Sequence, residues 1–420
     1  MEKLLNQWLW SEEFWLPPNI TWHDIEGTTG SSHQPLPRDL LVALPLALGF
    51  IAVRFAFERV VALPLSRKLG VFDRVQVRVP HNPKLEAFYS QRKKHFTQSE
   101  LMGLEKHCGL TQRQIHNWLR LRRNQDKPSN TKKFCEASWR FVFYLIAFMA
   151  GLAVLIDTAW FWDHRECWRG YPKQPVAKSH YWYYILELSF YWSLLLCVSV
   201  DVKRKDFKEQ IIHHIATVSL ISFSYCDNYI RVGTVVMLLH DSSDFLLESA
   251  KMFNYAGWKK TCDSLFVVFA VVFLGTRLFV FPCSPHPHET SPFPQETNCN
   301  WHRVLYSTFV ESLNFFKPFP AYYLFNGLLL VLQALHIFWA NLILRMLYKF
   351  VFLGKVERDE RSDESDVEEE GEDNGMEEEC CWEQNKGTLN SKLTSLANNC
   401  VLNNLTHQRR NMNSRLPKAR

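Results

Sequence analysis

Residues 211–244 read IIHHIATVSLISFSYCDNYIRVGTVVMLLHDSSD, which are two apolar runs separated by a short polar turn. Each run carries ionisable side chains: His213 and His214 in the first, and Asp241 and Asp244 in the second. A charged side chain inside a membrane helix costs about 2.5–3.5 kcal/mol on insertion scales, so such residues usually face a polar cavity. The stretch therefore predicts two antiparallel membrane helices that enclose a polar site.

The spacing of these polar residues places them on defined faces of their helices. Asp241, Asp244 and Glu248 follow an i, i+3, i+7 pattern and form one stripe. His213 and His214 lie about 100° apart around the helix axis, so only one of them can point squarely into a shared cavity. Buried polar residues can also serve merely to hold helices together. Two histidines and two aspartates on adjacent helices favour a reaction centre over that role, because their insertion is costly.

The residue types in this set suit acyl transfer. The sequence has no GxSxG elbow, no phosphate-binding glycine loop with a lysine, and no credible cysteine nucleophile. Histidine can act as nucleophile or base near neutral pH, and a carboxylate can orient it. An already activated donor, such as a thioester, needs no cofactor. A separate group of cysteines and histidines occurs in a segment that we interpret as a loop: Cys283, His286, His288, Cys299 and His302. Their spacing fits no zinc-binding motif, so no metal is expected.

The hydropathy pattern predicts an all-α, multi-pass transmembrane helical bundle. The mean hydropathy of −0.18 is an average over apolar spans and charged loops. Arg54, near the end of the first span, is expected to snorkel to the membrane interface. About seven spans are predicted, at 40–57, 139–156, 181–200, 211–223, 229–247, 265–281 and 322–347.

The charge distribution predicts how the chain crosses the membrane. The basic loop after the first span is expected to be cytoplasmic, which places the N-terminal segment 1–39 and its N-glycosylation sequon at Asn19 in the lumen. Seven crossings then place residues 349–420 in the cytoplasm. This acidic tail is too charged to fold alone. Ser362 and Ser365 lie in the acidic context that acidophilic kinases favour, so both are predicted phosphorylation sites.

A small cytoplasmic insert is predicted at residues 67–128, with three short helices. Its last helix, at 110–124, reads LTQRQIHNWLRLRRN and resembles the third helix of a homeodomain, with Trp118 as the core anchor. The adenine-reading asparagine of homeodomains would fall at Leu121, which cannot make bidentate hydrogen bonds to a base. DNA binding is therefore disfavoured, and the basic face could instead meet anionic lipid headgroups or substrate phosphates.

Several motifs give the chain a strong resemblance to the ceramide synthases, the Lag1 family of TLC-domain proteins. They read YWYY at 181–184, DVKRKDF at 201–207, IIHH at 211–214, NYIR at 228–231, HDSSD at 240–244 and ESAKM at 248–252. The match is long and specific, and it extends over nearly the whole chain. The resemblance implies a TLC catalytic membrane domain at 131–348.

The same resemblance implies an enzyme of the endoplasmic reticulum membrane that N-acylates sphinganine or sphingosine with acyl-CoA. His213 would be the acyl-accepting nucleophile, and His214, Asp241 and Asp244 would assist proton transfer and orientation, although the sequence alone could exchange the two histidines. No cofactor is implied, because acyl-CoA is a substrate. The expected partners are these substrates, membrane lipids and a second ceramide synthase chain in a homo- or heterodimer. Residues of the matching motifs expected to bind substrate are His240, Asn228, Arg231 and Lys205.

Three segments bear on the length of the acyl chain. The tail around residues 359–363 is similar to that of the very-long-chain type, ceramide synthase 2, which implies a very-long-chain acyl-CoA. Residues 283–300 depart from the family pattern and interrupt the sixth span with proline and polar residues, which lipid does not tolerate unless they loop out. They adjoin residues 317–323, a region that the resemblance links to acyl-chain choice.

Other classes of protein fit the sequence less well. A non-catalytic TLC-type protein that binds lipid or assists translocation would have no need to bury the histidines and aspartates. A membrane-tethered DNA-binding regulator is disfavoured by Leu121. A transporter is disfavoured because the sequence has no inverted repeat and no pair of Gly- or Pro-broken helices.

Overall fold

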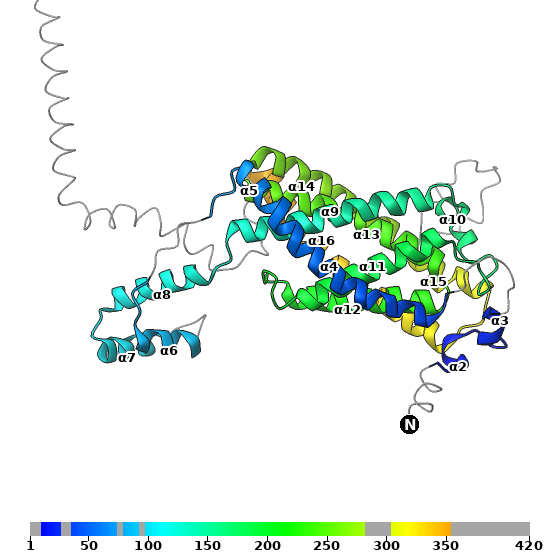
Figure 1. Ribbon diagram of the computed structural model, residues 1–420, viewed down its shortest axis with the longest axis horizontal. Helices are drawn as coiled ribbons and strands as arrows, with labels where there is room; N and C mark the ends of the chain where they lie inside the picture. The colour runs from blue at the N-terminus through cyan, green and yellow to red at the C-terminus, as the bar shows by residue number, and fades with distance from the viewer. Residues whose placement is uncertain (1–9, 27–34, 74–78, 92–96, 282–303, 354–420) are drawn as a thin grey trace, which may run out of the picture. The chain divides into compact units, whose positions relative to one another are not determined.

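The computed structural model describes residues 10–26, 35–73, 79–91, 97–281 and 304–353 (Figure 1). Every regular element in these ranges is a helix, as the sequence predicted. The acidic tail with Ser362 and Ser365 lies outside the described residues. The segment 283–300 and its neighbouring cysteines and histidines also lie outside them, so the loop interpretation of that segment stays a prediction.

The described chain outside the insert is built mainly from long helices that lie side by side (Figure 1). Helix α13 packs against α9 and α14, α11 packs against α4 and α12, and α12 packs against α16. The bounds of these helices are α4 Ala43–Phe57, α9 Asn130–Leu155, α11 Lys178–Cys197, α12 Phe207–Cys226, α13 Ile230–Tyr255, α14 Lys259–Leu274 and α16 Pro320–Leu353.

Four helical segments of the described chain are long and apolar enough to cross a membrane: Pro37–Lys68, Gln112–Leu155, Lys259–Val280 and Pro320–Phe352. The first joins α4 to the short helices η1 (Pro37–Val42), η2 (Glu58–Ala62) and α5 (Leu63–Lys68), and the third joins α14 to η4 (Gly275–Val280). Helices α11, α12 and α13 do not meet the same standard. They carry the buried carboxylates and histidines of the bundle, which lower their hydropathy. Seven membrane crossings therefore stay a prediction.

Short helices and loops cover one end of the bundle. Trp15 and Leu16 from the N-terminal segment pack in one core cluster with Trp168, Tyr229 and Phe325. This burial ties the segment to the bundle, because aromatic side chains of this size dominate core energetics. The short elements are α2 Glu12–Trp15, α3 Trp22–Glu26, α10 Ala159–Trp162, η3 His164–Cys167, α15 Val304–Phe309 and η5 Glu311–Asn314.

The sequon lies between α2 and α3. Asn19 is exposed and has a φ of 70°, a left-handed conformation that asparagine tolerates better than most residues. The Thr21 hydroxyl donates a hydrogen bond to Asp24 at 2.8 Å. Asn19 is therefore accessible, and its glycosylation stays a prediction.

The insert has a small core of its own. Helices α6 (Pro83–Gln91), α7 (Gln98–Cys108) and α8 (Gln112–Asp126) enclose Leu85, Ile115 and Trp118. The Trp118 indole donates to the Pro80 carbonyl at 2.8 Å, which confirms its predicted place as the core anchor. The resemblance to a homeodomain stays a prediction.

Arg122, a basic residue of α8, forms ion pairs with two carboxylates of the insert. Its guanidinium donates to Glu86 at 2.8 Å and to Asp126 at 2.5 Å. The Arg122 hydrogen bonds hold the pKa of the Glu86 carboxyl below its usual value. Arg122 is thus occupied within the insert, so it fastens α8 to α6 in addition to any contact that it makes with phosphate.

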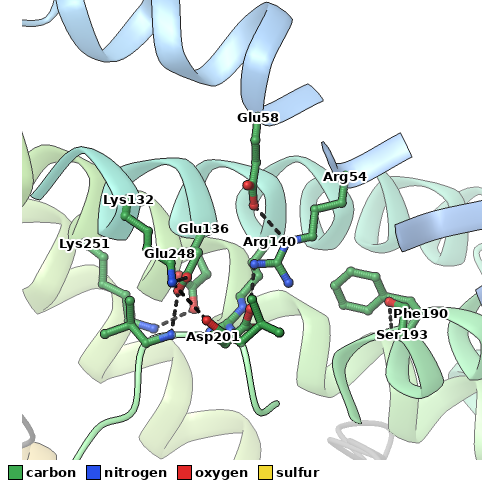
Figure 2. Close-up of polar contacts among 12 residues, drawn as sticks. Arg54, Glu58, Lys132, Glu136, Arg140, Phe190, Ser193, Asp201, Glu248 and Lys251 are labelled. Carbon is green, nitrogen blue, oxygen red and sulfur yellow. Dashed lines mark hydrogen bonds and ion pairs between the residues drawn. The ribbon is translucent and has the colours of Figure 1, made fainter. Parts of the chain in front are cut away.

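Figure 2 shows a network of charged side chains that joins α4, α9 and the loop after α11. Arg54 donates to Glu58 at 2.8 Å and to Asp201 at 2.6 Å, and Arg140 donates to the other oxygen of Asp201 at 2.7 Å. Arg54 is only 7% exposed. Two carboxylates therefore replace water around the Arg54 guanidinium, and its predicted reach to the membrane interface stays a prediction.

A second set of charges lies beside this network (Figure 2). Lys251 donates to Glu248 at 2.5 Å, and Lys132 approaches Glu136 at 4.0 Å. Glu136 also accepts from the Val202 backbone N–H at 3.3 Å. Glu248 therefore has a lysine partner on its own helix, and it does not line the cavity described below, although the sequence placed it on one stripe with the aspartates.

We predict that Asp201→Asn lowers the stability of the bundle by about 3 kcal/mol, because it weakens the counter-charge of the buried Arg54 and of the half-buried Arg140. The measurement is the thermal unfolding midpoint of the detergent-solubilised protein. The matched control is Arg169→Gln, which breaks the exposed ion pair with Glu166 and should cost less than about 1 kcal/mol. Equal losses for both variants would show that the network contributes nothing beyond a surface pair.

Candidate active site

A tight turn between α12 and α13 sets the register of the site. Asn228 adopts a left-handed conformation with a φ of 55°. Its side-chain amide donates to the Pro172 carbonyl at 2.7 Å and to the Gln174 carbonyl at 3.0 Å. The turn is thereby held in place, and the two helices run antiparallel. Residues near the start of α12 consequently lie level with residues in the middle of α13.

A narrow cavity lies among α11, α12, α13 and α16. The side chains that line it are Tyr184, Glu187 and Tyr191 from α11; His213, Thr217, Leu220, Ile221 and Ser224 from α12; Val236, Met237, His240 and Asp241 from α13, with Gly233; and Phe325, Leu329 and Leu332 from α16.

The lining changes character along the cavity. On α12 it runs from His213 through Leu220 to Ser224, with the three- and four-residue steps of one helix face. The antiparallel α13 runs the other way, so Asp241 lies towards His213 and Gly233 lies towards Ser224. The cavity is therefore polar at the histidine end, apolar along its middle, and bounded by hydroxyl groups at the far end.

His213, and not His214, lines the cavity. The His213 ring meets Trp339 edge-on, with ring centroids 5.4 Å apart, and Tyr191 at 6.4 Å. The Nδ1 atoms of both histidines are buried without a hydrogen-bond partner among the described residues. His214 instead lies within electrostatic range of Arg140. Of the two assignments that the sequence left open, this geometry favours His213 as the reacting group.

Two carboxylates face the same space. Asp241 is 1% exposed, lines the cavity and accepts a hydrogen bond from the Tyr183 hydroxyl at 3.4 Å. Glu187 of α11 is equally buried, also lines the cavity and interacts with Asp241. The sequence analysis missed Glu187. A carboxylate inside the predicted span 181–200 was the signal that could have found it.

Asp244 does not line the cavity. It accepts from Arg277 at 2.5 Å, and the same guanidinium donates to the Ser243 hydroxyl at 2.9 Å and to the His240 carbonyl at 3.0 Å. Arg277 is 3% exposed, and the sequence analysis missed it although it lies inside a predicted span. The pair fastens η4 to α13, so the contacts of Asp244 are those of a positioning residue.

His240 is held by hydrogen bonds at both ring nitrogens. Its Nδ1 lies 2.6 Å from the Val236 carbonyl, which can only accept, so Nδ1 carries the proton. Its Nε2 lies 2.9 Å from Nε2 of His336, which must then donate. His240 therefore has no free ring nitrogen to offer a substrate, while its ring still forms part of the cavity wall.

Three predicted substrate-binding residues lie away from the cavity. Asn228 belongs to the turn. Arg231 donates to the Glu166 carbonyl at 2.7 Å and lies over the Trp160 ring at 4.6 Å. Lys205 is exposed in the loop before α12. The structure thus brings His213, His240 and Asp241 together and keeps Asn228, Arg231 and Lys205 apart from them. Within the described ranges, no three His, Cys, Asp or Glu side chains are arranged to hold a metal ion.

We predict that His336→Leu destabilises the protein by about 1–3 kcal/mol, because it leaves the buried Nε2 of His240 without a donor. His336→Gln keeps an N–H in reach of that nitrogen and should recover much of the loss. Thermal unfolding of the two variants in detergent checks this. If the leucine variant is as stable as the parent, the pairing of the two histidines is not structural.

Comparison with known proteins identifies the family of the chain. The TLC domain family (TRAM_LAG1_CLN8) matches residues 133–345, which contain every element of the cavity. Ceramide synthase 4 of Bos taurus is 49% identical over 383 residues, or 91% of this chain and 92% of that protein. Ceramide synthase 4 of Homo sapiens is 50% identical over 367 residues (87% and 88%), and human ceramide synthase 3 is 46% identical over 360 (86% and 88%).

These relatives also correct one prediction. The acidic tail suggested ceramide synthase 2, whereas the matches over most of the chain point to type 4. A short charged segment is a weak guide to type, because its composition can arise without shared packing. The identity over more than four-fifths of the sequence leaves no such ambiguity about the family itself: the chain belongs to the ceramide synthases.

Proposed function

We propose that this chain joins a fatty acyl group from acyl-CoA to the amino group of a sphingoid base, and that the reaction takes place at the His213 end of the cavity. Ceramide synthase activity is supported by the relatives of the whole chain. The observation that carries the choice of site is that His213 and two carboxylates meet at one end of an otherwise apolar cavity.

The shape of the cavity suits an acyl chain. From His213 to Ser224 it follows eleven residues of α12, or roughly 16 Å at the rise of an α-helix. The walls between are made of leucine, isoleucine, valine and phenylalanine side chains, which favour burial of a hydrocarbon chain. A fatty acyl group that lies along this path presents its thioester carbonyl to His213.

In the first step, an unprotonated ring nitrogen of His213 attacks the thioester carbonyl. A carbon–nitrogen bond forms, the carbon–sulfur bond breaks, and the proton from the other ring nitrogen passes to the leaving thiolate. The product is an acyl-imidazole and free CoA. Histidine suits this role because its neutral ring is nucleophilic near neutral pH.

In the second step, the amino group of the sphingoid base attacks the acyl carbon. The amide bond forms, the bond to the ring nitrogen breaks, and the imidazole recovers a proton. The Glu187–Asp241 pair lines the same cavity as His213, and it takes up the proton that the amine loses and returns it to the ring. His214 and Asp244, expected to take part directly, support this arrangement from positions beside it.

The entry of CoA follows from the charge pattern. Lys205 is exposed in the basic loop that precedes α12, at the same end of that helix as His213, and suits the phosphates of CoA. This arrangement fits seven crossings of the endoplasmic reticulum membrane, with a lumenal N-terminus and a cytoplasmic C-terminus. Assembly with a second ceramide synthase chain completes the proposal.

We predict that His213→Ala abolishes formation of the amide, with a fall in rate of about a hundredfold or more. The assay uses membranes from cells that lack their own ceramide synthases, sphinganine and a mixture of acyl-CoAs, with products read by mass spectrometry. With labelled acyl-CoA and no sphinganine, the parent should retain protein-bound label and His213→Ala should not.

Two controls make this assay decisive. Thr217→Val changes a residue on the same face of α12 whose hydroxyl only donates to the His213 carbonyl at 2.8 Å, and it should leave most activity. His214→Ala should keep protein-bound label, because His214 does not line the cavity. Near-normal turnover by His213→Ala would remove it from the mechanism. A well-expressed parent that makes no product would favour a lipid-binding protein instead.

We further predict that Glu187→Gln and Asp241→Asn lower kcat with little change in KM for acyl-CoA. Each substitution keeps the size of the side chain but removes a group that can accept a proton, which costs about 100-fold or more when that group acts as a base. Steady-state rates with varied sphinganine and acyl-CoA give this separation. A rise in KM alone would assign the two carboxylates to binding.

A further inference from the structure

The end of the cavity farthest from His213 is closed by hydroxyl groups. The Tyr184 hydroxyl lies 3.1 Å from the Ser224 hydroxyl and 3.4 Å from the Ile230 carbonyl. Ser224 donates its only proton to the Ile221 carbonyl at 3.0 Å, so it accepts from Tyr184. The phenol of Tyr184 is therefore fixed between α12 and α13, at the bottom of the acyl path.

A glycine makes this position possible. A Cβ atom at Gly233 would lie 1.7 Å from the Tyr184 oxygen, far closer than any real contact, and 3.2 Å from the Ser224 oxygen. Glycine within a helix costs about 1 kcal/mol relative to alanine. Because Gly233 has no side chain, the Tyr184 hydroxyl can approach the backbone of α13 closely. Tyr184 thus lies over the backbone of α13 in a slot shaped for it.

The floor beneath Tyr184 is firmly packed. Tyr184 is 1% exposed, and its ring centroid lies 5.9 Å from that of Tyr225, which is completely buried. Tyr225 in turn donates to Asp39 at 3.0 Å. On the α16 side, Tyr229 meets Phe325 edge-on at 5.0 Å. A close-packed floor of this kind has no room to yield to a longer chain.

We infer that Tyr184, held by Ser224 and Gly233, is the stop that limits the length of the acyl chain. The inference rests on the proposed function, because it takes the cavity to be the acyl site. The terminal methyl group of the longest accepted chain contacts the Tyr184 ring, and each further methylene would have to displace it. Residues 317–323, where the resemblance located chain choice, do not line the cavity themselves.

The test compares product lengths, not rates. Membranes that contain the parent or a variant receive sphinganine and an equimolar mixture of saturated acyl-CoAs from medium to very long chain. Tyr184→Ala opens space at the floor, so the ratio of longer to shorter products should rise by about tenfold or more, since one methylene in a fitted pocket is worth 10–200-fold. Tyr184→Leu should shift the ratio in the same direction by less.

Gly233→Ala changes the same contact in the opposite sense. Its methyl group must push the Tyr184 ring from its slot towards the cavity, so the products should become shorter. The matched control is Tyr144→Ala, which removes a buried tyrosine of α9 that does not line the cavity and is not part of the floor beneath Tyr184. It should lower stability and total product without changing the length ratio.

The outcomes separate this inference from the proposed function. Parent membranes that make no ceramide would refute the proposed function. Active Tyr184→Ala and Tyr184→Leu with the parent length ratio would overturn the stop while leaving the function intact. An equal shift in Tyr144→Ala would overturn it as well, because general loosening would then explain the change. If Tyr184→Ala does not fold, the leucine and Gly233→Ala variants decide the matter by their opposite shifts.

Discussion

The register between α12 and α13 is the constraint on which the site depends. Two hydrogen bonds from Asn228 to the Pro172 and Gln174 carbonyls hold the turn that joins these helices. A shift of one residue along either helix would turn each side chain by about 100° and remove His213 or Asp241 from the shared cavity. The turn therefore takes no part in the chemistry. Its role is geometric, because the register that it sets decides which side chains can meet in the cavity.

The polar groups of the bundle fall into two sets with different purposes. Arg54 and Arg140 both form ion pairs with Asp201, and Arg277 forms one with Asp244. Such pairs offset the cost of desolvation and hold helices at fixed positions, and removing one partner is costly. His213 makes no such ion pair within the described residues, and its buried Nδ1 has no hydrogen-bond partner there. A polar atom left unpaired at that cost is free to react with a substrate.

His240 illustrates how tertiary contacts change the meaning of a motif. Its place in the HDSSD motif, which resembles that of the ceramide synthases, led to the expectation that it binds substrate. Hydrogen bonds to the Val236 carbonyl and to His336 occupy both of its ring nitrogens, so it acts as a wall and as a link to α16. His336 is about a hundred residues away in the chain, and a short motif holds no information about such a partner.

The sequence by itself determined the family, the helical class and the presence of a polar site, because the cost of ionisable groups in apolar helices is a local property. It also identified both histidines and Asp241. Only the tertiary structure decided that His213 lines the cavity and His214 does not, that Glu187 joins Asp241, and that Arg54 is paired inside the bundle. These outcomes depend on helix rotation and on contacts between distant segments. Hydropathy and residue spacing show that a helix has a polar face. Packing against the other helices decides which groups that face contacts.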